Sequence, residues 1–344
     1  MEDRVISPSI QQEDIPTERS LRPQTFSDFI GQDHLKECLD IFLRAAIERK
    51  EAVDHILFFG PSGLGKTTLA HIVSSVLGVQ MKHTSGPALE RPADLAGILT
   101  GLEEREVLFI DEIHRLGRIV EEYLYPAMED FAIDIVIDKG PSARSVKLNL
   151  AKFTLIGATT RSGLLTSAMR ERFGITQRLE YYPPENLYDI VMRSAKILGV
   201  VIDEEGAREI SFRSRGTPRI ANRLLKRVRD YAQIKADNKI TKDVADKALF
   251  MLGVDKKGLD DMDRRILRCI LEKFDGGPVG INNLSVSIGE DQQTLEEVFE
   301  PFLIAEGYIQ RTSNGRKITK IGCEYLGTKA TGAFLGDLWD ADEK

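Results

Sequence analysis

The sequence has few of the features that hold a metal, cross-link a small secreted domain or cross a membrane. Its three cysteines, Cys38, Cys269 and Cys323, lie far apart, without the spacing of a zinc site or a disulfide framework. Residues 1–20 are acidic and polar, without the apolar core of a signal peptide, and no apolar run approaches the roughly 18 residues of a membrane span. We therefore expect a cytoplasmic protein with three packed thiols and no disulfide, zinc or membrane partner.

An excess of positive charge is also missing. The 344 residues include 47 basic and 54 acidic side chains, and the net charge of −7, taken over the whole chain, argues against a nucleic-acid partner because phosphates attract positive surface. The balance varies along the chain, with 21 basic and 27 acidic residues in 1–182, 14 and 10 in 183–253, and 12 and 17 in 254–344. The length and the 42% hydrophobic content suffice for two or three packed domains.

Short apolar runs alternate with helical patterns in the first 182 residues. The runs at 56–59, 107–110 and 153–156 are typical of strands that are buried on both faces. Strands separated by helices predict a parallel α/β sheet. The Tyr-Tyr-Pro-Pro step at 181–184 ends a strand and starts a helix, so we expect this α/β domain to span 1–182.

The rest of the chain predicts two smaller domains. Residues 183–253 show helical patterns and no strand, which indicates a small helical domain; a charged link from Gly253 to Gly258 leads to the domain 254–344. There, three helices precede a hairpin around Ser313-Asn314-Gly315, since Asn-Gly is a strong turn signal, and this order predicts a winged helix. The expected helices span 187–198, 204–213, 219–232, 241–252, 262–274, 283–288 and 292–305, and the hairpin strands 308–312 and 316–319.

A phosphate-binding loop follows the first predicted strand. Residues 60–68, Gly-Pro-Ser-Gly-Leu-Gly-Lys-Thr-Thr, match the pattern G-x-x-x-x-G-K-[ST] between a strand and a helix. Glycines such as Gly63 and Gly65 let backbone amides surround phosphate oxygens at the amino end of the helix that begins near Lys66. Lys66 is expected to hold the β- and γ-phosphates of ATP, and the Thr67 hydroxyl to bind Mg²⁺, with Thr68 beside it.

Carboxylates and hydroxyls follow the next two buried strands. Asp111 and Glu112 end the strand 107–110, where Asp111 is expected to hold Mg²⁺ and Glu112 to act as general base on the attacking water. The strand 153–156 leads into Thr159 and Thr160 at the same carboxyl edge of the sheet, where ligands bind in open α/β sheets. Either threonine can orient the γ-phosphate or the water, and a simple strand-end cap is the alternative.

Three arginines complete the candidate ATPase residues. Arg170 and Arg172 share a short turn, and the rigid fork of arginine suits the charge of a transferring phosphoryl group, including one bound to a neighbouring subunit. Surface ion pairing is the alternative role. Arg219 lies in the first turn of a helix, where a cation opposes the helix dipole, so an external anion such as ATP is a reasonable purpose for it.

Basic residues gather in the predicted wing of the C-terminal domain. Arg311, Arg316 and Lys317 are candidates to clamp DNA phosphates without reading sequence, although a solvated charged face is the alternative. The helix 292–305, which in a winged helix would read bases, carries Glu296, Glu297 and Glu300 instead, and we expect DNA to repel it.

These residues resemble the AAA-plus ATPases and, among them, the family of bacterial motors that drive branch migration of Holliday junctions. The resemblance runs from about residue 21 to 319. It rests on motifs that include Leu108-Phe-Ile-Asp-Glu-Ile-His-Arg115, Tyr125-Pro-Ala-Met-Glu-Asp-Phe131, Gly157-Ala-Thr-Thr-Arg161, Arg170-x-Arg-Phe-Gly174 and Arg215-Gly-Thr-Pro-Arg-Ile-Ala-Asn-Arg223. The resemblance implies an ATPase domain, a helical lid and a winged helix.

The resemblance also implies roles for individual residues. Arg172 matches the arginine finger that reaches the ATP of the neighbouring subunit, with Arg170 as a helper. Thr159 or Thr160 matches the first sensor, and Arg219 the second. Further nucleotide contacts are implied for Leu21, Arg22, Glu129, Asp130, Phe131 and Tyr182.

Partners follow from the resemblance as well. The family works as a homohexameric ring on duplex DNA at Holliday junctions in recombination and repair, loaded by a RuvA-type junction-binding protein and joined by a RuvC-type resolvase. The stretch 133–150 alternates at period two around Lys139-Gly140-Pro141, which predicts a hairpin and matches the family's contact with the RuvA-type protein. Other classes are a protein unfoldase or clamp-loader-type ATPase and a non-hydrolysing regulator. A protein unfoldase usually grips its polypeptide with an aromatic residue of the central loop, and residues 84–106 contain no Phe, Trp or Tyr.

Overall fold

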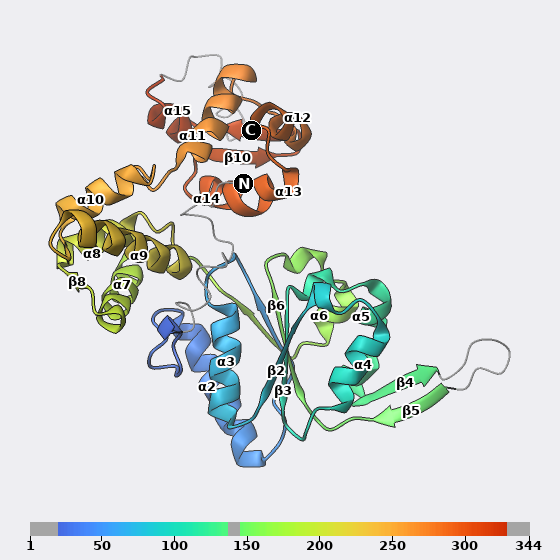
Figure 1. Ribbon diagram of the computed structural model, residues 1–344. Coiled ribbons are helices and arrows are strands. Elements are labelled where there is room, and N and C mark those ends of the chain that lie inside the picture. Colours follow the sequence, from blue (N-terminus) through green and yellow to red (C-terminus); the bar gives the residue numbers. More distant parts are fainter. Residues whose placement is uncertain (1–19, 137–144, 329–344) are drawn as a thin grey trace, which may run out of the picture. The chain divides into compact units, whose positions relative to one another are not determined.

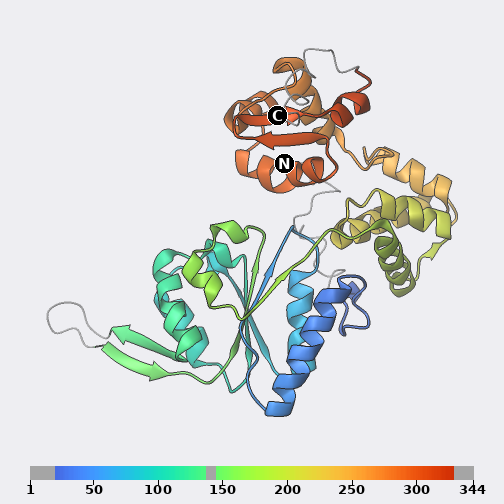
Figure 2. The same cartoon turned by 180° about the vertical axis from the view of Figure 1, so that it is seen from behind.

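The computed structural model describes residues 20–136 and 145–328, which form two compact units that divide between Asn186 and Leu187 (Figures 1 and 2). The first unit contains the central sheet, and the second contains the small helical domain and the C-terminal domain. No helix among these residues is both long and apolar enough to cross a membrane.

A five-stranded sheet in the order β2-β3-β6-β1-β7 forms the core of the first unit. Every pairing in it is parallel, as the alternation of strands and helices predicts. The three predicted strands are the inner strands, whereas β2 and β7 were missed because strands at the two edges of the sheet are only partly buried and carry polar residues. The strands are β1 (Ile56–Phe59), β2 (Met81–Ser85), β3 (Val107–Asp111), β6 (Thr154–Thr159) and β7 (Ile175–Arg178).

Helices cover both faces of this sheet. Figures 1 and 2 show α2 and α3 on one face and α4 and α5 on the other. On the second face, Leu57, Leu108 and Leu155 pack in one apolar cluster with Leu95 of α4 and Leu124 of α5. The helices are α2 (Asp33–Arg49), α3 (Lys66–Leu77), α4 (Pro92–Thr100), α5 (Arg118–Glu129) and α6 (Ser167–Glu171), with 3₁₀ turns at Gly86–Ala88, Ile113–Arg115 and Ser162–Leu164.

An antiparallel pair of strands extends from this unit. β4 (Ala132–Val136) pairs with β5 (Ser145–Asn149) in the register Ala132↔Asn149 to Val136↔Ser145, which confirms the predicted hairpin over the described part of 133–150. The predicted turn at Lys139-Gly140-Pro141 lies outside the described residues.

The helical domain has the predicted helices and one small sheet that was not predicted. The two-residue strands β8 (Val201–Ile202) and β9 (Lys239–Ile240) pair in parallel, so the expectation of no strand here was wrong. Two residues are too few to show a period of two in the sequence. The helices are α7 (Pro184–Leu198), α8 (Glu204–Phe212), α9 (Pro218–Lys235) and α10 (Lys242–Met251).

The C-terminal domain is the predicted winged helix. Its wing pairs β10 with β11, and the turn is Ser313-Asn314, because Thr312 already pairs with Gly315. Gly315 lies outside the turn and is needed because the backbone of Val279 packs closely against it. Its φ is +136°, and a Cβ there would lie 2.3 Å from the carbonyl oxygen of Val279. The elements are α11 (Asp261–Arg268) with a π turn at Cys269–Lys273, α12 (Ile281–Ile288), α13 (Gln292–Thr294) with a π turn at Leu295–Phe299, α14 (Glu300–Ala305), β10 (Ile309–Thr312), β11 (Gly315–Ile318) and α15 (Lys320–Tyr325).

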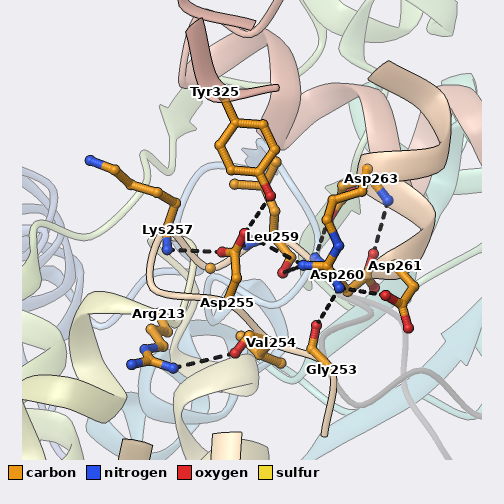
Figure 3. A network of polar contacts seen from close by, with 12 residues as sticks. Arg213, Gly253, Val254, Asp255, Lys257, Leu259, Asp260, Asp261, Asp263 and Tyr325 are labelled. Atoms are coloured by element: carbon orange, nitrogen blue, oxygen red, sulfur yellow. Dashed lines mark hydrogen bonds and ion pairs between the residues drawn. The ribbon is translucent and has the colours of Figure 1, made fainter. Parts of the chain in front are cut away.

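A polar network joins the helical domain to the winged helix (Figure 3). Arg213, which is 1% exposed, donates from Nη1 to the carbonyl oxygen of Val254 at 3.3 Å, and on the other side of the link the Tyr325 hydroxyl donates to Asp255. Arg215 forms a buried ion pair with Asp263 of α11. These contacts explain why the two domains fall in one compact unit.

Candidate functional site

The predicted phosphate loop lies between the end of β1 and the start of α3. Gly60, Gly63 and Gly65 have φ values of +139°, +80° and +104°, which side chains other than glycine rarely adopt. A Cβ at Gly60 would lie only 2.4 Å from the carbonyl oxygen of Leu179, so glycine is required there. Because α3 begins at Lys66, the loop joins a helix amino terminus and forms an anion site.

Lys66 turns its amine back into this loop. The side chain is 7% exposed, and Nζ donates to the carbonyl oxygens of Gly60 and Pro61, both at 2.8 Å. Thr67 and Thr68 follow in the first turn of α3 and are half-buried. The loop therefore places one cation and two hydroxyls at the carboxyl edge of the sheet.

Asp111 and Glu112 end β3 at the same edge. Burial, with the neighbouring Glu112 charge, raises the pKa of Asp111, although Lys66 acts in the opposite direction. Burial also tends to raise the pKa of Glu112, but the hydrogen bond and charge of His114 and the charge of Lys66 outweigh it, so the pKa lies below its ordinary value. Glu112 is therefore ionised near neutral pH, as a general base must be.

The two threonines after β6 have different surroundings. Thr160 donates from its hydroxyl to Glu112 Oε2 at 3.2 Å. The Thr159 hydroxyl is fully buried, lies 2.9 Å from His114 Nδ1 and accepts the backbone N–H of Arg161 at 3.0 Å. Only Thr160 therefore contacts the candidate base.

Sequence reasoning missed His114 as a member of this group. Its Nδ1 lies 3.2 Å from Glu112 Oε2 as well as near Thr159, and its side chain is 8% exposed. A signal was present in the sequence, because His114 stands only two residues after Glu112. The spacing alone, however, does not show that the 3₁₀ turn at Ile113–Arg115 brings the ring back to the carboxylate.

Tyr182 contacts the phosphate loop, and Arg22 lies near the helix that follows it. Tyr182 is 4% exposed and donates from its hydroxyl to the carbonyl oxygen of Leu64 at 3.1 Å. Leu21 is buried, and Arg22 is near enough to His71 of α3 that, after burial, its charge helps to lower the pKa of His71 to about 4. Tyr182 therefore belongs to the structure that surrounds the phosphate loop and Arg22 lies near α3, while nucleotide contact by the three residues stays a prediction.

Arg172 lies at the other edge of the sheet. Ile175 pairs with Ile56, the first residue of β1, whereas the phosphate loop follows the last residue of β1. The carboxyl end of α5 reaches this amino edge too, because Met128 accepts a hydrogen bond from His55. The structure thus brings Glu129, Asp130 and Phe131 to the same edge as Arg170 and Arg172, and away from the phosphate loop of their own chain.

Arg219 belongs to the second unit. It lies in the first turn of α9 and is half-buried. Arg215, four residues earlier, is fixed to Asp263 and stacks over the ring of Phe302 at 4.4 Å from the ring centre. The candidate sensor Arg219 therefore lies four residues along the chain from an arginine that binds the winged helix.

Arg316, one of the predicted DNA contacts of the wing, is buried against two acidic residues. Arg316 is 5% exposed, and its Nε donates to Glu300 Oε1 at 2.5 Å while Nη2 donates to Glu296 Oε1 at 2.8 Å. The charge of Arg316 is therefore enclosed and anchors the wing to the preceding helix, and contact of this residue with DNA stays a prediction. Arg311 remains exposed beside Glu296, and Lys317 is half-buried.

The same contacts change the view of the acidic helix. Glu296 and Glu300 are two of the three glutamates that were expected to repel DNA, and both form ion pairs with arginines of the wing. Glu300 is also only 2% exposed. The argument that acidic charge keeps this helix from DNA is correspondingly weaker.

Three family models match the chain in order. They describe the Holliday junction DNA helicase RuvB P-loop domain, the RuvB AAA lid domain and the RuvB C-terminal winged helix domain, and they match residues 21–179, 182–255 and 256–327.

Solved structures of RuvB from Thermotoga maritima are similar over nearly the whole chain. One, described as a Holliday junction branch migration motor, is 47% identical with a TM-score of 0.82, and the match covers 90% of this chain and 99% of that one. A lysine-to-arginine variant and an arginine-to-alanine variant of the same protein match at 47% identity with TM-scores of 0.83 and 0.82, covering 90% of this chain and 98% of theirs. The phosphate loop, the acidic strand end, the domain order and these matches together show that the chain belongs to the RuvB family, the AAA-plus ATPases that drive branch migration of Holliday junctions.

Proposed function

We propose that this chain hydrolyses ATP to move Holliday junctions along duplex DNA in recombination and repair, as a homohexameric ring. One observation carries the proposal. Lys66, Asp111 and Glu112 lie at the carboxyl edge of the sheet, and Arg172 lies at its amino edge. An arginine that stabilises the transferred phosphate in this family architecture must then come from another subunit, which a ring supplies at every interface.

Mg²⁺ suits the residues at the carboxyl edge. The Thr67 hydroxyl and the Asp111 carboxylate are hard oxygen ligands of the kind that Mg²⁺ accepts while it keeps several waters. These two residues would hold the ion, which neutralises charge on the β- and γ-phosphates when bound.

The residues of the chain divide the reaction among them. The backbone of Gly63 and Gly65 and the amine of Lys66 hold the phosphates, and the ionised Glu112 takes a proton from the attacking water. We assign the first sensor to Thr160, because its hydroxyl contacts Glu112 and the Thr159 hydroxyl does not. Arg219 is the second sensor and reports loss of phosphate to the second unit.

The wing and the β4–β5 hairpin supply the contacts with DNA and with partner proteins. Arg311 and Lys317 of the wing hold DNA phosphates, which suits a motor that moves over any sequence. The β4–β5 hairpin receives the RuvA-type junction-binding protein, and a RuvC-type resolvase completes the larger assembly.

The test is strand exchange on a synthetic four-way DNA junction with ATP, with and without a RuvA-type protein. We expect movement of the junction that requires ATP and increases with the partner. ATP turnover without any movement of the junction under either condition would contradict the proposal and favour another AAA-plus remodelling activity.

A further inference from the structure

Three groups from two helices hold the Arg172 side chain. Its Cζ lies 4.3 Å from the centre of the Tyr125 ring, its Nη2 lies 3.0 Å from Glu129 Oε1, and its Nη1 donates to the carbonyl oxygen of Ala168 at 2.7 Å. Tyr125 and Glu129 are four residues apart on α5 and therefore share one face of that helix. The guanidinium is held between this face and the turn that ends α6.

The Tyr125 ring is itself fixed at its far end. Its hydroxyl donates to Glu121 Oε1 at 2.7 Å and lies 3.0 Å from the hydroxyl of Thr166. Thr166 caps the amino end of α6, where its hydroxyl accepts the backbone N–H of Met169 at 3.1 Å, and Arg172 caps the other end of the same short helix. The tyrosine thus joins α5 to α6, and the position of its ring is set relative to Arg172.

The arginine retains one unused donor in this arrangement. Within the described part of the chain, Arg172 Nε is buried without a hydrogen-bond acceptor. A buried donor without a partner is costly, and such a group in a native structure calls for an explanation, of which a functional role is one. The guanidinium is therefore aligned by its own chain but not fully satisfied by it.

We propose that Tyr125 is the positioning residue of the arginine finger, and that Glu129 screens the finger until a phosphate replaces it. This inference rests on the proposed function, in which Arg172 acts on the ATP of a neighbouring subunit. The ring sets the plane of the guanidinium, which a flexible arginine otherwise loses through rotamer freedom. The Glu129 carboxylate would repel the phosphate oxygens of a nucleotide. An ion pair with Arg172 therefore explains an acid at this position better than nucleotide contact does.

The first test compares steady-state ATP turnover of the full-length protein and its Tyr125→Leu and Tyr125→Phe variants. A finger that loses its alignment lowers transition-state stabilisation, so Tyr125→Leu is expected to reduce kcat by about 10- to 100-fold with KM nearly unchanged. Tyr125→Phe keeps the ring and is expected to recover most of that loss. Tyr123→Leu is the matched control, because Tyr123 lies on α5 but on a different side of the helix. An equal loss in Tyr123→Leu would overturn the inference.

The second test mixes subunits. A Tyr125→Leu subunit keeps its own phosphate loop and base, so a Glu112→Gln subunit with an intact finger should restore turnover at their shared interface, and the mixture should exceed either variant alone. Arg172→Ala is the benchmark. If Arg172→Ala is rescued by mixing and Tyr125→Leu is not, positioning by Tyr125 is wrong while the proposed function stands. If Arg172→Ala turns over ATP normally, the finger step fails, and this inference fails with it.

Discussion

Glu112 of the ATPase unit and Glu300 of the winged helix are two glutamates with opposite kinds of partner. The Glu112 side chain is 34% exposed and is contacted by the Thr160 hydroxyl and the His114 ring. Glu300 is 2% exposed and receives two hydrogen bonds from the guanidinium of Arg316. A hydroxyl and an imidazole keep the Glu112 carboxylate ionised but able to accept a proton. The enclosed guanidinium of Arg316 instead gives Glu300 a structural role, in which it holds the wing to the preceding helix.

The comparison also separates the arginines. Arg316 is enclosed with its acids, while Arg172 is held by a ring, an exposed acid and a carbonyl oxygen, and its buried Nε has no acceptor among the described residues. The enclosed pair of Arg316 and Glu300 holds two elements together, whereas the acid that pairs with Arg172 is exposed and can be exchanged for another anion.

The strongest test of the comparison is Glu112→Gln. Because a glutamine cannot accept the proton of the attacking water, we expect ATP turnover to fall by about 100- to 10,000-fold. Nucleotide binding should persist, since the phosphate loop is unchanged. Turnover and equilibrium binding of a labelled nucleotide measure the two properties, and retention of normal turnover would remove Glu112 as the base.

The corresponding change in the wing is Arg316→Met. It leaves Glu300 buried without its partner, and breaking a buried pair costs about 3–5 kcal/mol. We expect rapid hydrogen exchange at the amides of β11, measured by mass spectrometry, and recovery in the Arg316→Met, Glu300→Leu double variant, in which no charge is left unpaired. A single variant as protected as the parent would show that the pair contributes little.

A smaller effect is expected for the exposed cations of the wing. Replacing Arg311 and Lys317 by alanine should weaken DNA binding and reduce the slope of log affinity against log salt by about 0.9 for each DNA phosphate that the protein no longer neutralises. ATP turnover without DNA should not change. Binding isotherms at several salt concentrations check this prediction, and an unaltered slope would exclude the wing from DNA binding.

The smallest effect concerns pH. His114 helps to lower the pKa of Glu112, so its removal in His114→Asn should raise that pKa. The base works in its ionised form, so activity is lost as pH falls through its pKa, and the acid limb of the kcat profile should move to higher pH in the variant. The loss should be greatest under acidic conditions and slight under mildly alkaline ones. An unmoved limb would mean that His114 acts only through packing.

Much of the ATPase unit could be predicted from local patterns. The phosphate loop needs a strand, glycines and a helix within about a dozen residues, and all of these lie together in the chain. The edge strands β2 and β7 escaped detection because half-buried strands show no continuous apolar run. The ion pairs of Arg316 with Glu296 and Glu300 were not predicted, because a basic hairpin looks alike in sequence whether its arginines face solvent or an acid of a neighbouring helix.

The sequence by itself determined the family, the order of the domains and the chemical groups available for ATP hydrolysis, because these depend on residue type and short spacing. The tertiary structure decided which charges are free. The contacts of Thr160 with Glu112, of Arg172 with Glu129 and of Arg316 with Glu300 join residues 48, 43 and 16 positions apart. Such distances along the chain are closed only by strand register and helix packing, which no local pattern specifies.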